Sequence, residues 1–345
     1  MVSYYLSCVA CNIEVFTFNN PPLERHFSKN FMDATEYFAL LKYMSTAAAL
    51  KLFSIFPGFY RFLGNTFGMK RRLRMLGRGI PGHYGDRAKL FISMCNKYNT
   101  VNNGDDVIEI GTGWVHFESI VLRLFYDVKA TLFDVWDNRQ LEALKQVFIQ
   151  LEKLLYKKMD LDESKKKNIK QLIHAISTTD SLDNLYNVLS FQYEIDPSGT
   201  LDRFGNESFQ MIYSCNVMEH IDKKGAHQFV KSFYRLLKPG GFSVHRIDLS
   251  DHLVRFAGIH NMLMKNYLKY SDKVWKICFE NRVQYINRIQ CSEWLSCFEK
   301  AGFEVLEKKV QCCEIDLSKV AKMYKHLRKN DLECESIIVV HRKPA

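Results

Sequence analysis

Residues 105–114 read Asp-Asp-Val-Ile-Glu-Ile-Gly-Thr-Gly-Trp, and this stretch decides the fold. Its apolar positions predict a short buried strand over residues 106–110. The strand runs into Gly111-Thr112-Gly113, a tight turn in which glycine tolerates a positive φ and lets a ligand approach the backbone. A second strand-like run ends at Asp134, about 20 residues further on, where an acid is placed to bind ribose hydroxyls. The pattern therefore indicates a site for a cofactor that contains a nucleoside.

The glycine turn is compatible with two classes of cofactor. A dinucleotide site prefers a third glycine, in the pattern Gly-x-Gly-x-x-Gly, and no third glycine follows Gly113 at that spacing. Glu109 would repel a pyrophosphate, because like charges repel, but it suits a cationic amino-acid group. Glu-x-Gly-x-Gly resembles the first motif of class I S-adenosylmethionine-dependent methyltransferases. On this motif alone, a glycine turn that binds no ligand remains the alternative.

Two later motifs strengthen the resemblance. Residues 208–221 read Ser-Phe-Gln-Met-Ile-Tyr-Ser-Cys-Asn-Val-Met-Glu-His-Ile and resemble the fourth-strand motif of the same family. Residues 235–244 read Arg-Leu-Leu-Lys-Pro-Gly-Gly-Phe-Ser-Val and resemble the family's helix end, its chain-reversing Lys-Pro-Gly-Gly turn and its fifth strand. Together the three motifs imply an α/β, Rossmann-like fold. Its seven-stranded, mostly parallel sheet would have the order 3-2-1-4-5-7-6, with the last strand antiparallel.

The chain of 345 residues can hold one large domain with additions. We divide it into an N-terminal helical and basic extension, residues 1–90, and a methyltransferase domain, residues 91–345. Helical insertions are expected at about 139–190, which is longer than one crossover helix needs, and at 253–285. Strand and helix patterns alternate, which predicts helices on both faces of the sheet. The predicted strands are 106–110, 129–134, 191–195, 209–214, 241–247, 303–309 and 335–342.

The N-terminal extension pairs an apolar and aromatic helix, predicted over residues 36–56, with a basic cluster between Lys70 and Arg78. We expect a helical cap that packs on the sheet and covers the cofactor. The alternatives for residues 36–78 are an interfacial helix on an anionic membrane and an RNA-binding extension, and the formal net charge of +10 suits an anionic partner. Nothing resembles a known RNA-binding module, so nucleic acid is not an expected partner.

Two sequence patterns bear on cellular location and metal content, the signal peptide and the cysteine spacing of zinc sites. The N-terminus shows no signal-peptide pattern, so we expect a cytoplasmic protein, with peripheral membrane contact as the alternative. The ten cysteines show no zinc-site spacing, because the pair Cys8 and Cys11 has no matching second pair. We therefore expect thiols in a reducing compartment and no structural metal.

In an open parallel sheet, ligands bind beyond the carboxyl ends of the strands. The resemblance implies that the first motif holds the methionine part of S-adenosylmethionine, the expected cofactor. It places Asp134 at the ribose, with Asp137 as the alternative, and Asp196 at the adenine. Asn216 would lie at the border between cofactor and acceptor. The full predicted cofactor set is Glu109, Gly111, Thr112, Gly113, Trp114, Asp134, Asp196 and Asn216.

Residues 245–252 read His-Arg-Ile-Asp-Leu-Ser-Asp-His and gather two histidines and two aspartates at the end of the fifth strand. Methyl transfer to oxygen usually needs a base for the acceptor proton, and a histidine with a near-neutral pKa suits that task. We predict His252 as the base, with Asp251 or Asp248 orienting its ring, and we include His245 in the catalytic set. The alternatives are a divalent cation that activates a sugar diol and a polar network that shapes the pocket.

The same stretch resembles a bacterial subgroup of methyltransferases met among surface-polysaccharide and secondary-metabolite enzymes. The resemblance implies that residues 253–288 form a lid, with Asn287 and Arg288 facing the site. Glu219 is expected to brace a helix, and His220 is either structural or catalytic. We therefore predict O-methylation of a carbohydrate, a glycolipid or a related small molecule. The alternatives are an RNA methyltransferase and a non-catalytic scaffold with the cofactor fold.

Overall fold

The computed structural model describes residues 34–56, 58, 69–259 and 262–345. Cys8 and Cys11, the pair considered as metal ligands, lie outside these residues. Among the helices that the structure describes, none is both long enough and apolar enough to cross a bilayer.

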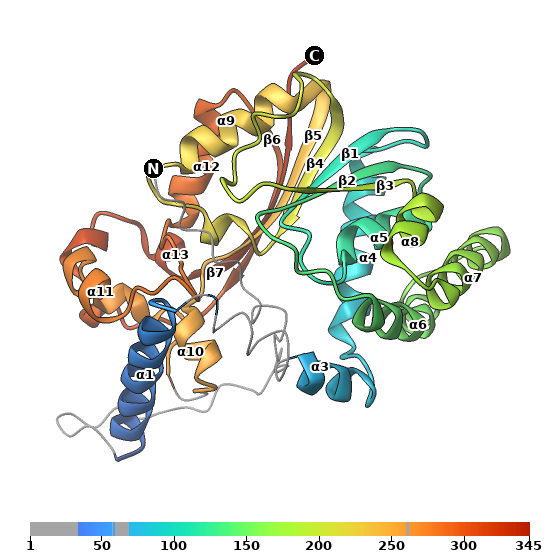
Figure 1. The fold of residues 1–345 in the computed structure, drawn as a ribbon. Coiled ribbons are helices and arrows are strands. Elements are labelled where there is room, and N and C mark those ends of the chain that lie inside the picture. Colours follow the sequence, from blue (N-terminus) through green and yellow to red (C-terminus); the bar gives the residue numbers. More distant parts are fainter. Residues whose placement is uncertain (1–33, 57, 59–68, 260–261) are drawn as a thin grey trace.

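A sheet of seven strands runs through the middle of the molecule (Figure 1). The strands are β1 (Asp106–Ile110), β2 (Lys129–Asp134), β3 (Phe191–Ile195), β4 (Phe209–Cys215), β5 (Leu237–Asp248), β6 (Glu304–Cys312) and β7 (Cys334–Arg342). Their order is β3-β2-β1-β4-β5-β7-β6, and β7 runs antiparallel to both β5 and β6. The predicted order and the antiparallel last strand are therefore confirmed.

The fifth strand begins earlier than predicted. β5 already pairs with β4 at Leu237, and its register shifts before the pairing resumes at Phe242. The Pro239-Gly240-Gly241 segment therefore bulges within the strand, where the sequence had suggested a turn that precedes it. Gly240 has a φ of +76°, and a Cβ on Gly241 would lie 2.8 Å from the carbonyl oxygen of Lys238. Both glycines are needed for this bulge.

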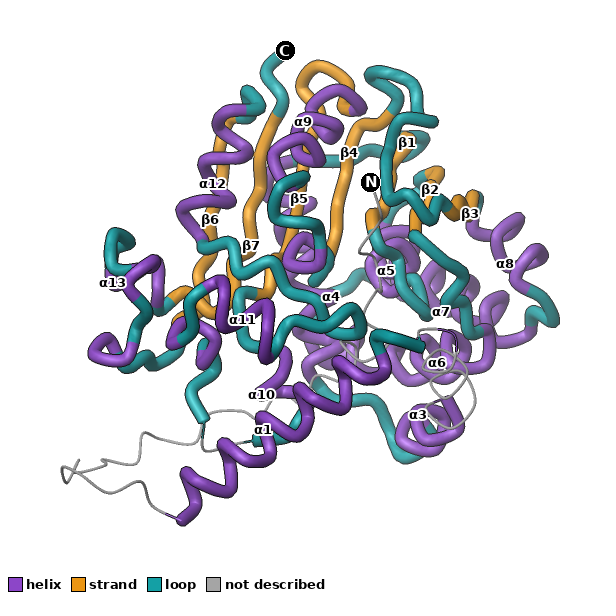
Figure 2. Tube along the Cα trace, turned by 60° about the vertical axis from the view of Figure 1, so that its left-hand side comes forward, coloured by secondary structure: helices purple, strands orange, loops and turns teal. Residues whose placement is uncertain are grey.

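Helices cover both faces of the sheet (Figures 1 and 2). One face packs against four helices, which are α4 (His83–Tyr98), α5 (Phe117–Phe125), α6 (Leu141–Lys158) and α7 (Glu163–Thr178). The other face packs against α9 (Ala226–Leu236) and α12 (Cys291–Lys300). The short helix α8 (Leu182–Leu189) leads into β3, and α3 (Met69–Leu76) packs on α6. The central strands of the sheet are thus buried on both faces, so ligands are expected at the edge where the parallel strands end.

The helices form where apolar residues recur at helical spacing. In α6 the buried residues are Ala143, Leu144, Val147, Phe148, Leu151 and Leu155. This stripe faces the core while the charged residues of α6 face outward. Residues 139–190, expected to be helical, thus contain α6, α7 and α8.

A third apolar core lies apart from the sheet. It joins α1 (Ala34–Phe53) to α10 (His252–Phe256), α11 (Asp272–Cys278), α13 (Lys329–Leu332) and the 3-10 turn at Asn266–Lys269. The face of α1 that packs here consists of Ala39, Tyr43, Ala47 and Leu50. Figure 2 shows α1 running alongside α10. The N-terminal helix therefore packs on the insertion that follows β5, where we had expected it to lie on the sheet.

Candidate cofactor and acceptor site

The turn after β1 depends on its glycines. Gly111 has a φ of +68° and Gly113 a φ of +65°, a conformation that L side chains rarely adopt. A Cβ on Gly111 would lie 2.5 Å from Cγ2 of Val217, which follows β4. The backbone amide of Gly113 donates a hydrogen bond to the Asp134 carboxylate at 3.1 Å. The turn is therefore a tight cradle of backbone between the ends of β1, β2 and β4.

The residue at the position of the missing third glycine adopts the conformation that glycine would take. His116 precedes α5 with a φ of +48°. Its Nδ1 lies 2.8 Å from the Thr112 hydroxyl, and its Nε2 lies 2.8 Å from the Tyr186 hydroxyl of α8. Burial lowers the pKa of His116 to about 3, so the ring is neutral. Trp114, in the same turn, is buried and accepts a hydrogen bond from the Gln140 amide.

Glu109 braces the turn from within. Its carboxylate accepts hydrogen bonds from the Thr112 hydroxyl at 3.1 Å and from the Ser119 amide at 3.2 Å, and the Ser119 hydroxyl donates as well. The side chain is 2% exposed. Burial, reinforced by the nearby Glu118, raises the pKa of Glu109 to about 8. The predicted contact of Glu109 with the methionine part of the cofactor stays a prediction.

Two of the predicted residues, Asp134 and Asp196, stand at the ends of the neighbouring strands β2 and β3. Asp134 is buried and accepts hydrogen bonds from Gly113 and from the Val135 amide at 2.7 Å. Burial raises the pKa of Asp134 to about 6. The backbone amide of Asp196 donates to the Asp134 carbonyl at 3.0 Å. Asp137, the alternative ribose ligand, pairs instead with Arg139 at 2.6 Å.

Asn216 directly follows β4, with a φ of +57° and its amide hydrogen-bonded to the Arg246 carbonyl of β5 at 2.9 Å. It precedes Val217, the residue in contact with Gly111. The structure therefore brings Asn216 to the glycine turn. The backbone cradle, the acid at the end of β2 and this polar residue therefore lie together, and their predicted contacts with the cofactor stay predictions.

A second group of polar side chains comes from the segments that follow β4 and β5. The 3-10 turn Met218–His220 and the start of α10 bring Glu219, His220 and His252 together. All three are buried, and one nitrogen or carboxylate oxygen from each lies within 4.8 Å of the others. His220 Nδ1 donates to the Tyr285 carbonyl at 2.6 Å. Burial, reinforced by the nearby His252, lowers the pKa of His220 to about 3, so the ring is neutral.

Asp248 lies behind this group and is ionised. Its Oδ2 is 3.7 Å from His252 Nε2 and 3.5 Å from an Arg255 nitrogen. Burial disfavours the charge on Asp248, but Arg255 and His252 outweigh burial and hold its pKa well below the usual range. Arg255 also pairs with Glu335 of β7 at 2.9 Å. Of the two aspartates predicted to orient His252, Asp248 is therefore the one whose carboxylate lies 3.7 Å from its Nε2, and its orienting role stays a prediction.

The other two residues of the predicted catalytic set are engaged elsewhere. Asp251 caps α10 through the Leu253 amide at 2.9 Å and accepts the Tyr43 hydroxyl of α1 at 2.7 Å. His245 is buried against α9, stacked on Phe233, and its two nitrogens lie 2.7 Å from serine hydroxyls. The structure does not bring His245 to the edge of the sheet, because it stands three residues before Asp248 and faces the opposite side.

The insertion after α10 holds the 3-10 turn in place. The Asn287 side chain donates to the carbonyls of Met218 and Ile221 at 2.8 and 3.1 Å, and its amide donates to the Glu219 carbonyl at 2.8 Å. Arg288 turns away, over the Trp275 ring, and pairs with Asp272. Of the two residues expected to face the site, Asn287 therefore supports Glu219, and Arg288 braces the insertion.

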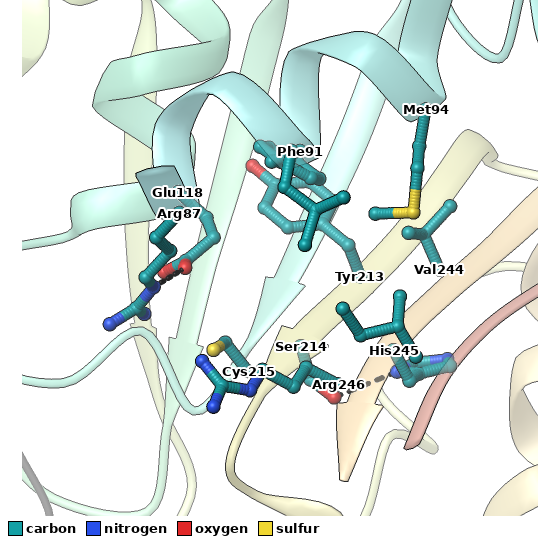
Figure 3. A pocket seen from close by; sticks show the side chains of 12 residues that line it. Arg87, Phe91, Met94, Glu118, Tyr213, Ser214, Cys215, Val244, His245 and Arg246 are labelled. Atoms are coloured by element: carbon teal, nitrogen blue, oxygen red, sulfur yellow. Dashed lines mark hydrogen bonds and ion pairs between the residues drawn. The ribbon is translucent and has the colours of Figure 1, made fainter. Parts of the chain in front are cut away.

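A pocket lies between α4 and the ends of β4 and β5 (Figure 3). Its polar end holds Cys215, Arg246 and Arg87, and Arg87 forms an ion pair with Glu118. Its apolar lining includes Leu90, Phe91, Met94, Val244 and Ile338. Sequence reasoning missed Arg87 and its neighbours, because only the packing of α4 on the sheet brings them to the strand ends. Glu219 was also missed as a member of the His252 group, although its motif was recognised.

Comparison with known proteins gives the family. The model of a methyltransferase domain family matches residues 86–308, which is more than half of the chain. No curated protein matches the chain. Many solved structures are similar to it, three of which follow. The first is a chain from the complex between the Haloferax volcanii Trm112 methyltransferase activator and its methyltransferase partner (15% identity, 83% of this chain and 96% of that chain, TM-score 0.40).

The second is the [4+2]-cyclase SpnF (10% identity, 75% of this chain and 81% of that chain, TM-score 0.39). The third is Haemonchus contortus phosphoethanolamine N-methyltransferase 2 in complex with S-adenosyl-L-methionine (12% identity, 74% of this chain and 53% of that chain, TM-score 0.40). Similarities at this level say nothing about the acceptor. The sheet order, the glycine cradle and the family match agree, and the chain belongs to the class I S-adenosylmethionine-dependent methyltransferases.

Proposed function

We propose that this methyltransferase acts on a hydroxyl group of a carbohydrate, a glycolipid or a related small molecule. The observation that supports this is the buried group around His252, whose member Glu219 follows Asn216 by three residues after β4. S-adenosylmethionine, when bound, supplies a methyl group on a positively charged sulfur. The remaining work belongs to the chain, which aligns the acceptor oxygen and removes its proton.

His252 is the group best placed to receive that proton. Asp248 is ionised and lies 3.7 Å from its Nε2, so this carboxylate is placed to orient the ring. His220 has its Nδ1 committed to the Tyr285 carbonyl, and burial keeps its ring neutral. The proton would therefore pass from the acceptor hydroxyl to His252, with Asp248 as the orienting residue. Such a base suits an alcohol acceptor, because a hydroxyl must lose its proton during transfer.

The pocket in Figure 3 indicates what else the acceptor carries. Its apolar lining ends at Arg87 and Arg246, next to the carboxyl ends of β4 and β5. A guanidinium group binds phosphate and carboxylate groups well. We therefore expect acceptors with an anionic group beside an apolar or ring-shaped body, such as sugar phosphates and glycolipid headgroups.

A methyl-transfer assay tests the proposal. The full chain is incubated with S-adenosylmethionine labelled on its methyl group and with oligosaccharides, sugar phosphates, glycolipids or total RNA. We expect label in a glycan or glycolipid. We also expect His252→Gln to slow transfer by roughly 10²–10⁴-fold without weakening binding of S-adenosylhomocysteine.

The matched control is His174→Ala, which removes an exposed histidine of α7. It should leave the rate of transfer unchanged. Label found in RNA alone, and lost after RNase treatment, would replace the proposal with an RNA methyltransferase. Equal rates for His252→Gln and the unmodified chain would remove His252 as the base.

A further inference from the structure

We propose that Glu219, His220 and His252 form a binding site for one divalent transition-metal ion, which would hold the acceptor by two neighbouring oxygens. The use of this ion rests on the proposed function, whereas its binding does not. The three side chains come from two segments that follow different strands, the 3-10 turn after β4 and helix α10 after β5. The group therefore forms only when these two segments pack together in the fold, and no single short stretch of sequence contains it.

The residue types match those of known metal sites. Two histidine nitrogens and one carboxylate oxygen are a common set of protein ligands for zinc, iron and manganese, and they leave positions open for substrate or water. In this chain the three ligand atoms lie within 4.8 Å of one another. An ion with bonds of about 2.0–2.2 Å would draw them somewhat closer. Glu219, His220 and His252 are 2%, 8% and 4% exposed, so bulk water hardly competes for them.

The surroundings orient the ligands in the manner typical of metal sites. Metal-binding histidines usually donate their other ring N–H to a carbonyl or a carboxylate. His220 Nδ1 donates to the Tyr285 carbonyl at 2.6 Å, which makes Nε2 the unprotonated nitrogen of the neutral ring. Asp248 lies 3.7 Å from His252 and plays the carboxylate part for the second histidine. Asn287 fixes the backbone of Glu219 at 2.8 Å.

The position of the three ligands indicates what the ion would do. Glu219 and His220 come three and four residues after Asn216, on the stretch that contacts the glycine turn through Val217. An ion here would lie beside the methyl-bearing end of the cofactor. It would bind two adjacent hydroxyl groups of a sugar and lower the pKa of one of them.

Methyl transfer would then change three bonds. The acceptor O–H bond breaks and its proton passes to solvent, a bond forms from that oxygen to the methyl carbon, and the carbon–sulfur bond breaks. The sulfur keeps that electron pair and becomes a neutral thioether. With an ion in place, His252 acts as a ligand and need not accept the proton.

Calorimetric titration of the chelator-treated full chain with Co²⁺, Zn²⁺ and Mn²⁺ tests the site directly. We expect one ion per chain, and visible absorption bands from Co²⁺ bound through nitrogen. Glu219→Gln, which keeps the shape and removes the charge, should weaken binding by at least about tenfold, and so should His252→Gln. The control His174→Ala should bind as the unmodified chain does. Circular dichroism establishes that each variant is folded.

The proposal is overturned if the chain binds no ion with this stoichiometry, or if Glu219→Gln and His252→Gln bind it as tightly as the unmodified chain. Methyl transfer in excess chelator separates this outcome from the proposed function. Unchanged transfer to a glycan in chelator, still dependent on His252, would leave the function standing with His252 as a base and remove the ion. One tightly bound ion without transfer to any glycan would leave the site standing and remove the proposed acceptor.

Discussion

Gly111 is the residue at which the cofactor cradle is most sensitive. We expect Gly111→Ala to abolish S-adenosylmethionine binding, because its Cβ would lie 2.5 Å from Val217 and a φ of +68° disfavours any L side chain. Calorimetric titration measures the loss. Gly104→Ala is the matched control, since Gly104 also has a positive φ but open space around it. Equal loss of binding in both variants would show that backbone strain, and not contact with Val217, explains the effect.

If Asp134 binds the ribose as predicted, cofactor binding should depend on pH. Burial raises its pKa to about 6, and the ionised carboxylate is the form that accepts hydrogen bonds from both ribose hydroxyls. The affinity for S-adenosylmethionine should therefore fall as the pH drops below about 6. Asp134→Asn should bind weakly at every pH. The same change at Asp137 should leave the pH profile intact, and a flattened profile there would move the ribose to Asp137.

Single residues also show where sequence reasoning succeeds. The structure brings most of the residues predicted to bind the cofactor to the ends of β1, β2 and β4, because they lie in short motifs that follow these strands, and their contact with the cofactor stays a prediction. The catalytic set could not be settled, because residues 245–252 cross from a strand into a helix. The alternation of the strand separates His245 from Asp248. Glu219 joins His252 only through the packing of α10, to which no local pattern points.

Among the elements, α1 is held in position by its residue Tyr43. The Tyr43 hydroxyl donates to Asp251 at 2.7 Å in a buried setting. We expect Tyr43→Phe to lower the free energy of unfolding by about 1–3 kcal/mol, because a buried carboxylate loses a donor. Urea denaturation measures the change. Tyr37→Phe, on the half-exposed face of the same helix, should have no effect, and equal stability of both variants would contradict the role of this contact.

The elements themselves were largely predictable, but their contacts were not. The strands, and the helices of residues 139–190, follow from apolar periodicity and from the three motifs. The bulge in β5 escaped prediction, since the same Pro-Gly-Gly sequence suits a turn as well as an interruption within a strand. The position of α1 was not predicted either, because an apolar helix face does not specify which core it packs against.

At the scale of the whole molecule, buried histidines set the response to acid. His341 is fully buried, stacks on Phe298 with ring centroids 4.1 Å apart, and has no hydrogen-bond partner among the described residues. Burial lowers its pKa from 6.5 to about 3. A histidine with a lowered pKa contributes stability above pH 6.5, and this contribution is lost as the pH falls from 6.5 towards 3.

We therefore expect His341→Phe to keep the stacking and to raise the free energy of unfolding most at low pH. Relative to pH 8, its advantage over the unmodified chain should grow by about 2 kcal/mol at pH 5. Denaturation curves at the two pH values give this difference. An advantage that does not change with pH would show that the proton on His341 does not contribute to acid unfolding.

The whole account depends on one cofactor site at the ends of β1, β2 and β4. Calorimetric titration of the full chain with S-adenosylmethionine, S-adenosylhomocysteine and NAD tests it most directly. We predict that the first two bind, one per chain, that NAD does not, and that Gly111→Ala abolishes the binding. Binding of NAD in their place, or no binding of any of the three, would contradict the account and would favour a scaffold that keeps the fold without the reaction.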